Sequence, residues 1–415
     1  MATMDLSRPA IEGGAPVRDT QVRPWPTWPV VGEDQWLEKL EPALREVYFS
    51  QVEGLGGSWQ ERFSEEFAIY CAAKHCCLLS HGTEALSAAL AAALDLDGFG
   101  DGGEVIVPNY TFIASVSAVL DMHCEVALVD VDPQTFTLCP DAVRQAIRPG
   151  RTRAIMAVHI AGQPCDMKSL NAIAAEHGLM VIEDCAQAHG AIHDGKPVGG
   201  LAHAAGFSFQ SSKNLCSGEG GAVTSNDTAI HNRVVGLMNA GREPRGARWK
   251  YARIGWNYRP SEYVAAVLSV RLDDLEKQAE HRTRMADYLS QQLSAVSGIT
   301  PPRRGQWCTR HAYHLYPMLI DESQFGGRSR DKIVEAVNAE GITVSSGYTD
   351  LLSNQPGLKQ LAADHVDAVR VEPCPVTEDV CRRSIWVFQE MLLASESDMD
   401  DIAAAFAKLQ RAFAG

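Results

Sequence analysis

The sequence predicts an α/β protein with a large doubly wound domain, built on a mostly parallel sheet, and a smaller C-terminal α+β domain. The first observation is that short apolar segments alternate with helical segments from residue 58 to about residue 225. The second is that several of these short segments are apolar nearly throughout, as strands are when helices cover both faces of a parallel sheet. The third is the length of 415 residues, 46% of them hydrophobic, which is enough for two domains with sizeable cores.

The elements of the large domain follow from this alternation. The expected strands are residues 75–80, 104–108, 126–130, 152–159, 180–184, 204–209 and 222–225. The expected helices are residues 59–71, 82–94, 112–122, 141–147 and 167–177. In a doubly wound sheet, ligands bind beyond the carboxyl ends of the strands. Polar residues that directly follow these strands are therefore the first candidates for a functional site.

The N-terminal segment contains Pro24-Trp-Pro-Thr-Trp-Pro29, which cannot be helical and is expected to form an extended arm. Its two tryptophans need burial, and a partner subunit is one surface that would cover them. A helix over residues 33–47 is expected to follow. The arm and this helix form the first predicted unit, residues 1–57.

The rest of the chain divides into a large domain at residues 58–270 and a small domain at residues 271–415. A long helical stretch at 257–293 is expected to bridge them, so that the small domain begins with the linking helix. The remaining elements expected are a strand at 311–320, a helix at 330–340, a strand that begins at 343 and a last helix at 397–413.

The charge and composition exclude several classes of protein. A net charge of −15 argues against binding to nucleic acid or to an anionic membrane surface. The sequence contains no apolar run long enough to span a bilayer, and its first residues lack the basic and apolar regions of a signal peptide. The eleven cysteines are scattered, as is usual for buried thiols in a cytoplasmic protein, and those between Cys71 and Cys77 match no standard zinc pattern. We therefore expect a cytoplasmic protein without a metal site.

Three strand ends carry candidate site residues. Gly82 and Thr83 open a helix after the first strand, where free backbone N–H groups favour a phosphate, although an ordinary helix cap has the same pattern. Phe112 follows the second strand, where its ring could stack on a flat ligand or pack in the core. Asp184 ends a buried strand, so its carboxylate must be either functional or paired in a cap or salt bridge.

The fourth candidate is Lys213, which lies in a tight connection between two strands. Ser208 precedes it by five residues, and a glycine-rich run begins at Gly218. A lysine held there can be partly desolvated, which favours the neutral amine that attacks a carbonyl to form a Schiff base. A surface lysine in a glycine loop is the alternative. Together the four features match pyridoxal 5′-phosphate (PLP), a flat, phosphorylated aldehyde with a pyridine nitrogen.

These motifs resemble those of the DegT/StrS family of PLP-dependent sugar and aminocyclitol aminotransferases, which have the type I (aspartate aminotransferase) fold. The resemblance extends from about Gly13 to the C-terminus. The segments that carry it are Gly82-Thr-Glu-Ala-Leu86, Pro108-Asn-Tyr-Thr-Phe-Ile-Ala-Ser115, Glu183-Asp-Cys-Ala-Gln-Ala-His-Gly190, Phe207-Ser-Phe-Gln-Ser-Ser-Lys-Asn-Leu215 with Gly218-Glu-Gly-Gly221, and Gly255-Trp-Asn-Tyr-Arg259. Members of this family aminate keto-sugars and keto-cyclitols, often in bacterial pathways to antibiotics and other secondary metabolites.

The resemblance implies a role for each cofactor residue. Lys213 would form the imine with PLP and move protons, and Asp184 would pair with the pyridine nitrogen. Gln187 would contact the ring or its hydroxyl, and Phe112 would stack on the ring. The residues that would hold the phosphate are Gly82, Thr83 and Ser208, with Asn257 reaching the phosphate of a neighbouring subunit. The working unit would therefore be a homodimer with shared active sites.

The resemblance also implies which segments contact the substrate. The family places His and Tyr residues of one segment near it, and the corresponding residues are His311, Tyr313, His314 and Tyr316. Tyr348 lies in a second such segment, where this chain departs from its relatives by having Thr349-Asp350 in place of their x-Pro. The segment from Ile385 to Leu393 is more similar to the inosose and aminohydroxybenzoate branches than to the nucleotide-sugar branch, yet it lacks the Leu-Pro that often precedes the last helix.

The predicted function is transfer of an amino group from glutamine or glutamate to a cyclic ketone, a keto-cyclitol or keto-sugar. An aminobenzoate-forming synthase, which couples amination to aromatisation of a dehydroshikimate-like ketone, remains an alternative. A non-catalytic regulator with the same fold is an alternative of another class. The histidine that replaces the cofactor lysine in dehydrating relatives is not found here, since Lys213 occupies that position.

Overall fold

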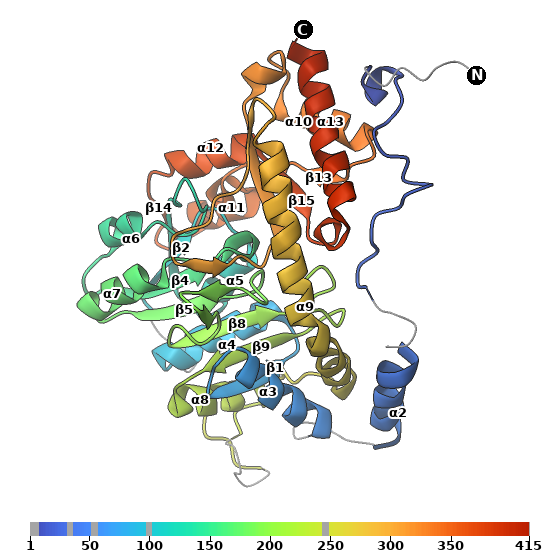
Figure 1. The fold of residues 1–415 in the computed structure, drawn as a ribbon. Helices are drawn as coiled ribbons and strands as arrows, with labels where there is room; N and C mark the ends of the chain where they lie inside the picture. Colours follow the sequence, from blue (N-terminus) through green and yellow to red (C-terminus); the bar gives the residue numbers. More distant parts are fainter. Residues whose placement is uncertain (1–7, 31–35, 51–56, 97–101, 243–248, 415) are drawn as a thin grey trace.

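The computed structural model describes residues 8–30, 36–50, 57–96, 102–242 and 249–414. Its centre is an eight-stranded sheet between helices (Figure 1). In spatial order the strands are β1 (His75–Leu79), β9 (Gly221–Ser225), β8 (Ala204–Ser208), β5 (Met180–Asp184), β4 (Thr152–Val158), β2 (Glu104–Pro108), β3 (Glu125–Val129) and β14 (Val369–Val371). All of them run parallel except β9, which is antiparallel to both of its neighbours.

Helices cover the two faces of this sheet because its strands are apolar on both sides. In β1, Cys77 and Leu79 face one core and Cys76 and Leu78 face another, as the period of two in a strand requires. The first face packs against α4 (Gly82–Leu94), with α5 (Ala114–Asp121) and α8 (Thr228–Met238) beside it. The other face packs against α3 (Ser58–Tyr70), α6 (Pro140–Ala146) and α7 (Met167–His177). The predicted doubly wound architecture is confirmed.

The long helix α9 (Glu262–Leu293) runs from the large sheet to a second, antiparallel sheet near the C-terminus (Figure 1). The strands of that sheet, in spatial order, are β10 (Ile299–Thr300), β12 (Leu315–Ile320), β15 (Ser384–Phe388) and β13 (Val344–Ser345). The helices α10 (Arg330–Ala339) and α13 (Glu396–Ala414) pack on it in a separate core. A third sheet joins β11 (Cys308–Arg310) to β6 (Ile192–His193) and β7 (Lys196–Pro197).

The C-terminal part of the chain also contributes to the large sheet. After α11 (Pro356–Asp364), β14 pairs in parallel with β3, and α12 (Pro375–Arg383) then leads back to the small sheet. Residues 369–371 thus belong to the large sheet although the expected small domain spans 271–415. The expected boundary at residue 270 also falls inside α9, so the division into domains stays a prediction.

Several elements begin later than expected, for local reasons. The strand expected at 311–320 begins at Leu315, because Tyr313 has a φ of +46°, outside the β region. The helix expected from 257 begins at Glu262, after Pro260, and the Ser261 side chain caps it by accepting from the Tyr263 N–H. Residues 33–35 of the expected helix at 33–47 lie outside the described residues, and the rest forms a π-helical turn (Trp36–Leu40) and α2 (Glu41–Ser50).

The N-terminal arm is extended, as expected, but its tryptophans contact their own chain. Trp25 Nε1 donates to the Gly341 carbonyl at 2.9 Å, and Trp28 Nε1 donates to the Ser211 carbonyl at 2.9 Å. The arm therefore links the small sheet to the loop that carries Lys213. No helix among the described residues is long and apolar enough to cross a membrane.

Candidate active site

A cavity of about 640 Å³ opens at the carboxyl ends of β5 and β8, where the large sheet meets the small one. The predicted site residues that line it are Gly82, Thr83, Phe112, Asp184, Gln187, Ser208, Lys213, His314 and Tyr348. They come from six separate segments of the chain. The sheet order explains why they meet, since β5 and β8 are adjacent and α4 packs across them.

Asp184 is the last residue of β5 and is only 5% exposed. Its Oδ2 accepts from the Ser115 hydroxyl at 2.7 Å, and its Oδ1 accepts from the Ala186 N–H at 3.1 Å. Burial raises the pKa of this carboxyl, while the two hydrogen bonds and the positive charge of Lys213 act in the opposite direction. A buried acid with a lysine nearby can hold a proton on a basic ring nitrogen.

Lys213 lies in the loop between β8 and β9, and its backbone N–H donates to the Gln210 carbonyl at 2.9 Å. Burial lowers the pKa of its ammonium group, and only the charge of Asp184 opposes this effect. Within the described part of the chain, its amine takes part in no hydrogen bond or ion pair. A partly desolvated amine without a partner is suited to condensation with an aldehyde.

The first turn of α4 meets the end of β8 at very close range. A Cβ on Gly82 would lie 2.5 Å from the Cβ of Ser208, so glycine is required here. The side chain of the residue that precedes the helix, His81, contacts the Glu84 carboxylate at 3.2 Å and does not cap the backbone N–H groups of the first turn. The N–H groups of this turn, with the Thr83 and Ser208 hydroxyls, form a cradle for an anion such as phosphate.

Phe112 and Gln187 lie on the walls of the same cavity. Phe112 is 56% exposed, which rules out the core-packing alternative for its ring within this chain. Gln187 is buried, and its Oε1 accepts from the Ala161 N–H at 2.6 Å. This bond leaves the Nε2 group of the amide to make other contacts. Both placements suit contacts to a flat ring between Phe112 and the end of β5.

Other predicted residues are not brought to this cavity. His311 and Tyr313 are buried and stacked on each other with ring centroids 3.9 Å apart. Tyr316 lies in the core of the small sheet, where its hydroxyl is 2.8 Å from Ser290 Oγ. Asn257 is exposed, lies outside the cavity of its own chain and pairs through its backbone with Asn239.

The structure adds residues to which the sequence pattern assigned no role. Ser115 lies in the segment that follows β2, but its bond to Asp184 depends on the packing of α5 against the sheet. Trp28 comes from the arm, and its position in the sequence carries no signal of a site. Trp386 of β15 and Gln389 just after it lie in the segment from Ile385 to Leu393 that the resemblance associated with the substrate, and both line the cavity.

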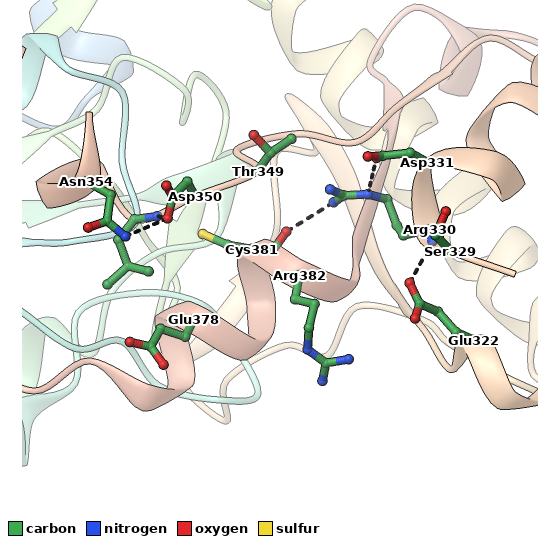
Figure 2. Close-up of a pocket in the computed structure, with 11 residues that line it drawn as sticks. Glu322, Ser329, Arg330, Asp331, Thr349, Asp350, Asn354, Glu378, Cys381 and Arg382 are labelled. Atoms are coloured by element: carbon green, nitrogen blue, oxygen red, sulfur yellow. Dashed lines mark hydrogen bonds and ion pairs between the residues drawn. The ribbon is translucent and has the colours of Figure 1, made fainter. Parts of the chain in front are cut away.

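A second hollow, of about 450 Å³, lies between the start of α10 and the C-terminal half of α12 (Figure 2). Its charged groups bind one another: Arg330 Nε donates to Asp331 at 2.7 Å, and Arg330 Nη1 donates to the Cys381 carbonyl at 3.1 Å. Asn354 Nδ2 likewise donates to Asp350 at 2.7 Å. Because these groups are already paired, the cavity beside Lys213 is the candidate active site.

Comparison with known proteins identifies the family of the chain. The model of the DegT/DnrJ/EryC1/StrS aminotransferase family matches residues 37–407. The L-glutamine:2-deoxy-scyllo-inosose aminotransferase of Streptoalloteichus tenebrarius is 37% identical over 422 residues, which cover 97% of each chain. The enzyme of the same name from Micromonospora echinospora is 36% identical over 424 residues, covering 96% of this chain and 97% of that one.

Solved structures show the same fold. The 3-amino-5-hydroxybenzoic acid synthase superimposes with a TM-score of 0.82 at 30% identity, covering 93% of this chain and 98% of that chain. An aminotransferase from Psychrobacter cryohalolentis superimposes with a TM-score of 0.83 at 28% identity, covering 94% and 100%. The predicted type I fold is confirmed. The chain is an aminotransferase and belongs to the DegT/DnrJ/EryC1/StrS aminotransferase family.

Proposed function

We propose that this enzyme uses PLP to transfer the amino group of L-glutamine to a keto-cyclitol. The observation that carries the proposal is that Lys213, Asp184 and the first turn of α4 meet in one cavity. The donor and the acceptor are taken from the relatives, several of which are named L-glutamine:2-deoxy-scyllo-inosose aminotransferases and match along nearly the whole chain.

The residues of the cavity fit PLP. Among the described residues, the amine of Lys213 has no hydrogen-bond partner, so it is available to the aldehyde. The first turn of α4 has no side-chain cap and excludes a side chain at Gly82, which leaves its N–H groups available to the phosphate. Asp184 is buried next to the place where a pyridine nitrogen would lie. When bound, PLP supplies an electron sink that makes the α-hydrogen of an amino acid acidic.

The protein's own groups would then perform three tasks. Asp184, held by Ser115 and the Ala186 N–H, keeps the ring nitrogen protonated. Lys213 Nζ, with a pKa lowered by burial, would accept the proton from the α-carbon of the amino donor. In the second half-reaction it would deliver a proton to the carbon that carried the ketone. Phe112, on the cavity wall, would cover one face of the ring and help to exclude water.

Borohydride reduction of the PLP-loaded enzyme tests the cofactor site. Peptide mapping should find the phosphopyridoxyl group on Lys213. A label on another lysine would contradict the assignment.

The acceptor is tested by converting the enzyme to its pyridoxamine form and adding one ketone at a time. We expect 2-deoxy-scyllo-inosose or scyllo-inosose to restore the PLP spectrum faster than a nucleotide-linked 4-keto-sugar or phenylpyruvate. The similarity to 3-amino-5-hydroxybenzoic acid synthase keeps one second candidate, and faster return with 3-dehydroshikimate would favour that aminobenzoate-forming reaction.

We also propose that the enzyme is a cytoplasmic homodimer in which Asn257 serves the neighbour's phosphate site. On the same segment Trp249, Tyr251 and Ile254 are 70%, 54% and 57% exposed, and such a group of apolar side chains supports an interface there. All eleven cysteines are free thiols, as is usual in a reducing compartment.

A further inference from the structure

Two arginines of α9 are buried at the edge of the candidate active-site cavity. Arg282 is 0% exposed and Arg271 is 8% exposed. The ring of Trp28, which lines the cavity, lies against both of them: its centroid is 5.0 Å from Arg271 Cζ and 5.2 Å from Arg282 Cζ. Two buried cations therefore lie directly behind one side chain of the cavity wall.

Arg282 lacks the partners that a buried cation needs. Its Nη2 donates to the side-chain oxygen of Gln389 and, at 3.4 Å, to that of Gln278, but its Nε and Nη1 are buried without a hydrogen-bond partner. Neither Arg282 nor Arg271 forms an ion pair with a carboxylate in the part of the chain that the structure describes. Burial and the charge of Arg271 lower the pKa of Arg282 to about 9, although the nearby Glu390 carboxylate acts in the opposite direction. An unpaired buried charge is costly, so a ligand that pairs with it would gain that energy.

Gln389 adds a further donor to the same cluster. Because a guanidinium group can only donate, the amide oxygen of Gln389 must face Arg282, and its Nε2 is buried without a partner. Gln389 itself lines the cavity. The unpaired atoms of the two residues are thus all N–H donors, and the planar array of an arginine matches the two oxygens of a carboxylate.

We infer that Arg282 and Gln389 form the subsite for the α-carboxylate of the amino donor, with Trp28 as its cover. This inference rests on the proposed function, since the amino acid carries a carboxylate and a keto-cyclitol carries none. The subsite is near the reacting centre, because Gln389 and Trp28 line the same cavity as Lys213. Burial lowers the pKa of His314, a residue of the cavity wall, and the charges of Lys213 and Arg282 add to that effect. The Trp28 indole moves aside when the carboxylate reaches the guanidinium group.

The test measures the two half-reactions of the PLP-loaded Arg282→Met enzyme separately. The rate constant kcat/KM for L-glutamine in the first half-reaction should fall about 100-fold, because a buried charge pair is lost. The reaction of the pyridoxamine form with the ketone should stay within about twofold of wild type, because the ketone does not use the subsite. L-Glutaminol, which has an alcohol in place of the carboxylate, should react equally slowly with both enzymes.

Thermal unfolding of the cofactor-free proteins gives a readout that does not depend on turnover. Arg282→Met should unfold at the same temperature as wild type or higher, because the substitution removes an uncompensated cation. Arg330→Gln is the matched control: Arg330 is also buried, but its bonds to Asp331 and to the Ser346, Cys381 and Ser384 carbonyls are satisfied. That variant should unfold at a lower temperature and keep the ratio of the two half-reactions. Arg282→Lys, which retains the charge, should recover part of the glutamine reaction.

Two results would overturn the inference while leaving the proposed function intact. One is an equal loss in both half-reactions of Arg282→Met, which would make the residue a support for the whole cavity or a contact for the ketone. The other is a fall in unfolding temperature as large as that of Arg330→Gln, or failure to fold, which would make Arg282 structural. Failure of the wild-type enzyme to react with any amino acid or ketone would instead refute the proposed function.

Discussion

At the scale of single residues, the site depends on a buried carboxylate whose charge is only partly balanced by hydrogen bonds and a nearby lysine. Asp184 is buried, yet it accepts two hydrogen bonds and lies near a lysine, so it is held in place without a full ion pair. Asp130 follows the strand β3 in the same sheet and is also buried, but it accepts from the Val376 N–H, the Thr377 N–H and the Thr377 hydroxyl. Both carboxylates lie at strand ends. The partners of Asp130 are groups of α12, which gives it a structural role, whereas Asp184 lies in the cavity beside Lys213 and is proposed to have a chemical role.

Asp184→Asn is expected to bind PLP and to lose transamination by at least about 100-fold, because an amide cannot keep the ring nitrogen protonated. Single-turnover conversion by glutamine measures the loss. Asp130→Asn serves as the control, since it should lower thermal stability by weakening the start of α12 and leave the rate per folded molecule unchanged. Turnover of Asp184→Asn near the wild-type rate would count against the whole arrangement.

At the scale of secondary-structure elements, the contact between the start of α4 and the end of β8 shapes the anion cradle. Gly82 allows the helix to approach Ser208, and Gly221 of β9 approaches the His81 carbonyl, which lies 2.2 Å from where a Cβ would be. Both approaches depend on the absence of a side chain. The helix therefore presents its free N–H groups at the point where β8 ends.

Gly82→Ala should lower the free energy of unfolding by about 1–3 kcal/mol and weaken PLP binding, because the added methyl group lies 2.5 Å from Ser208 Cβ. Chemical denaturation and a spectroscopic PLP titration measure the two effects. Gly357→Ala in the first turn of α11 is the control, since a Cβ there meets no atom within 4 Å. Equal effects of the two substitutions would mean that the close contact is unimportant.

At the scale of the whole molecule, the N-terminal arm ties the two sheets together as it runs from beside α13 toward α2 (Figure 1). Arg18 Nη1 donates to Asp398 at 2.7 Å and to Asp401 at 2.9 Å on α13, and Trp28 then reaches Ser211 near Lys213. Although burial alone would raise the pKa of Asp398, hydrogen bonds from Ser395, Arg18 and Arg23 hold it below its ordinary value.

The lowered pKa of Asp398 predicts a stability difference that depends on pH. Because the carboxyl is more acidic in the folded protein, its contribution is present above its unfolded pKa of about 4 and is lost as the pH falls further. Asp398→Asn should therefore cost about 2 kcal/mol at pH 7, and the difference from wild type should shrink as the pH falls below about 4. Thermal unfolding from pH 7 to pH 3 measures this, and a difference that is independent of pH would exclude the ionic contact.

The homodimer with shared sites is tested by mixing two inactive proteins. Lys213→Ala and Asn257→Ala, each impaired alone, should form mixed dimers in which one site has both native residues. Partial recovery of activity after subunit exchange, with the exchange followed by mass spectrometry, is the expected result. Mixed dimers without recovered activity would show that Asn257 does not act across the interface.

The sequence by itself determined the alternation of strands and helices and the residues at the strand ends. The apolar pattern of a parallel sheet covered on both faces can be read from the local sequence. Asp184 stands out because it ends an apolar strand, and Lys213 stands out in the tight connection between two strands. The same reasoning could not place His311, Tyr313 and Tyr316, which share a segment with His314 but are buried away from the cavity. The positive φ of Tyr313 turns the chain just before β12, so the side chains on the two sides of this turn do not share one face.

Only the tertiary structure decided which strand ends are neighbours, because the order of the strands in the sheet differs from their order in the chain. It also decided which distant side chains complete the cavity: Trp28 from the arm, Ser115 from α5 and Gln389 from the end of β15. Arg282 illustrates the physical reason. On α9 it has the spacing of any core-facing residue. Its burial without an ion pair becomes visible only when the packing around it is known.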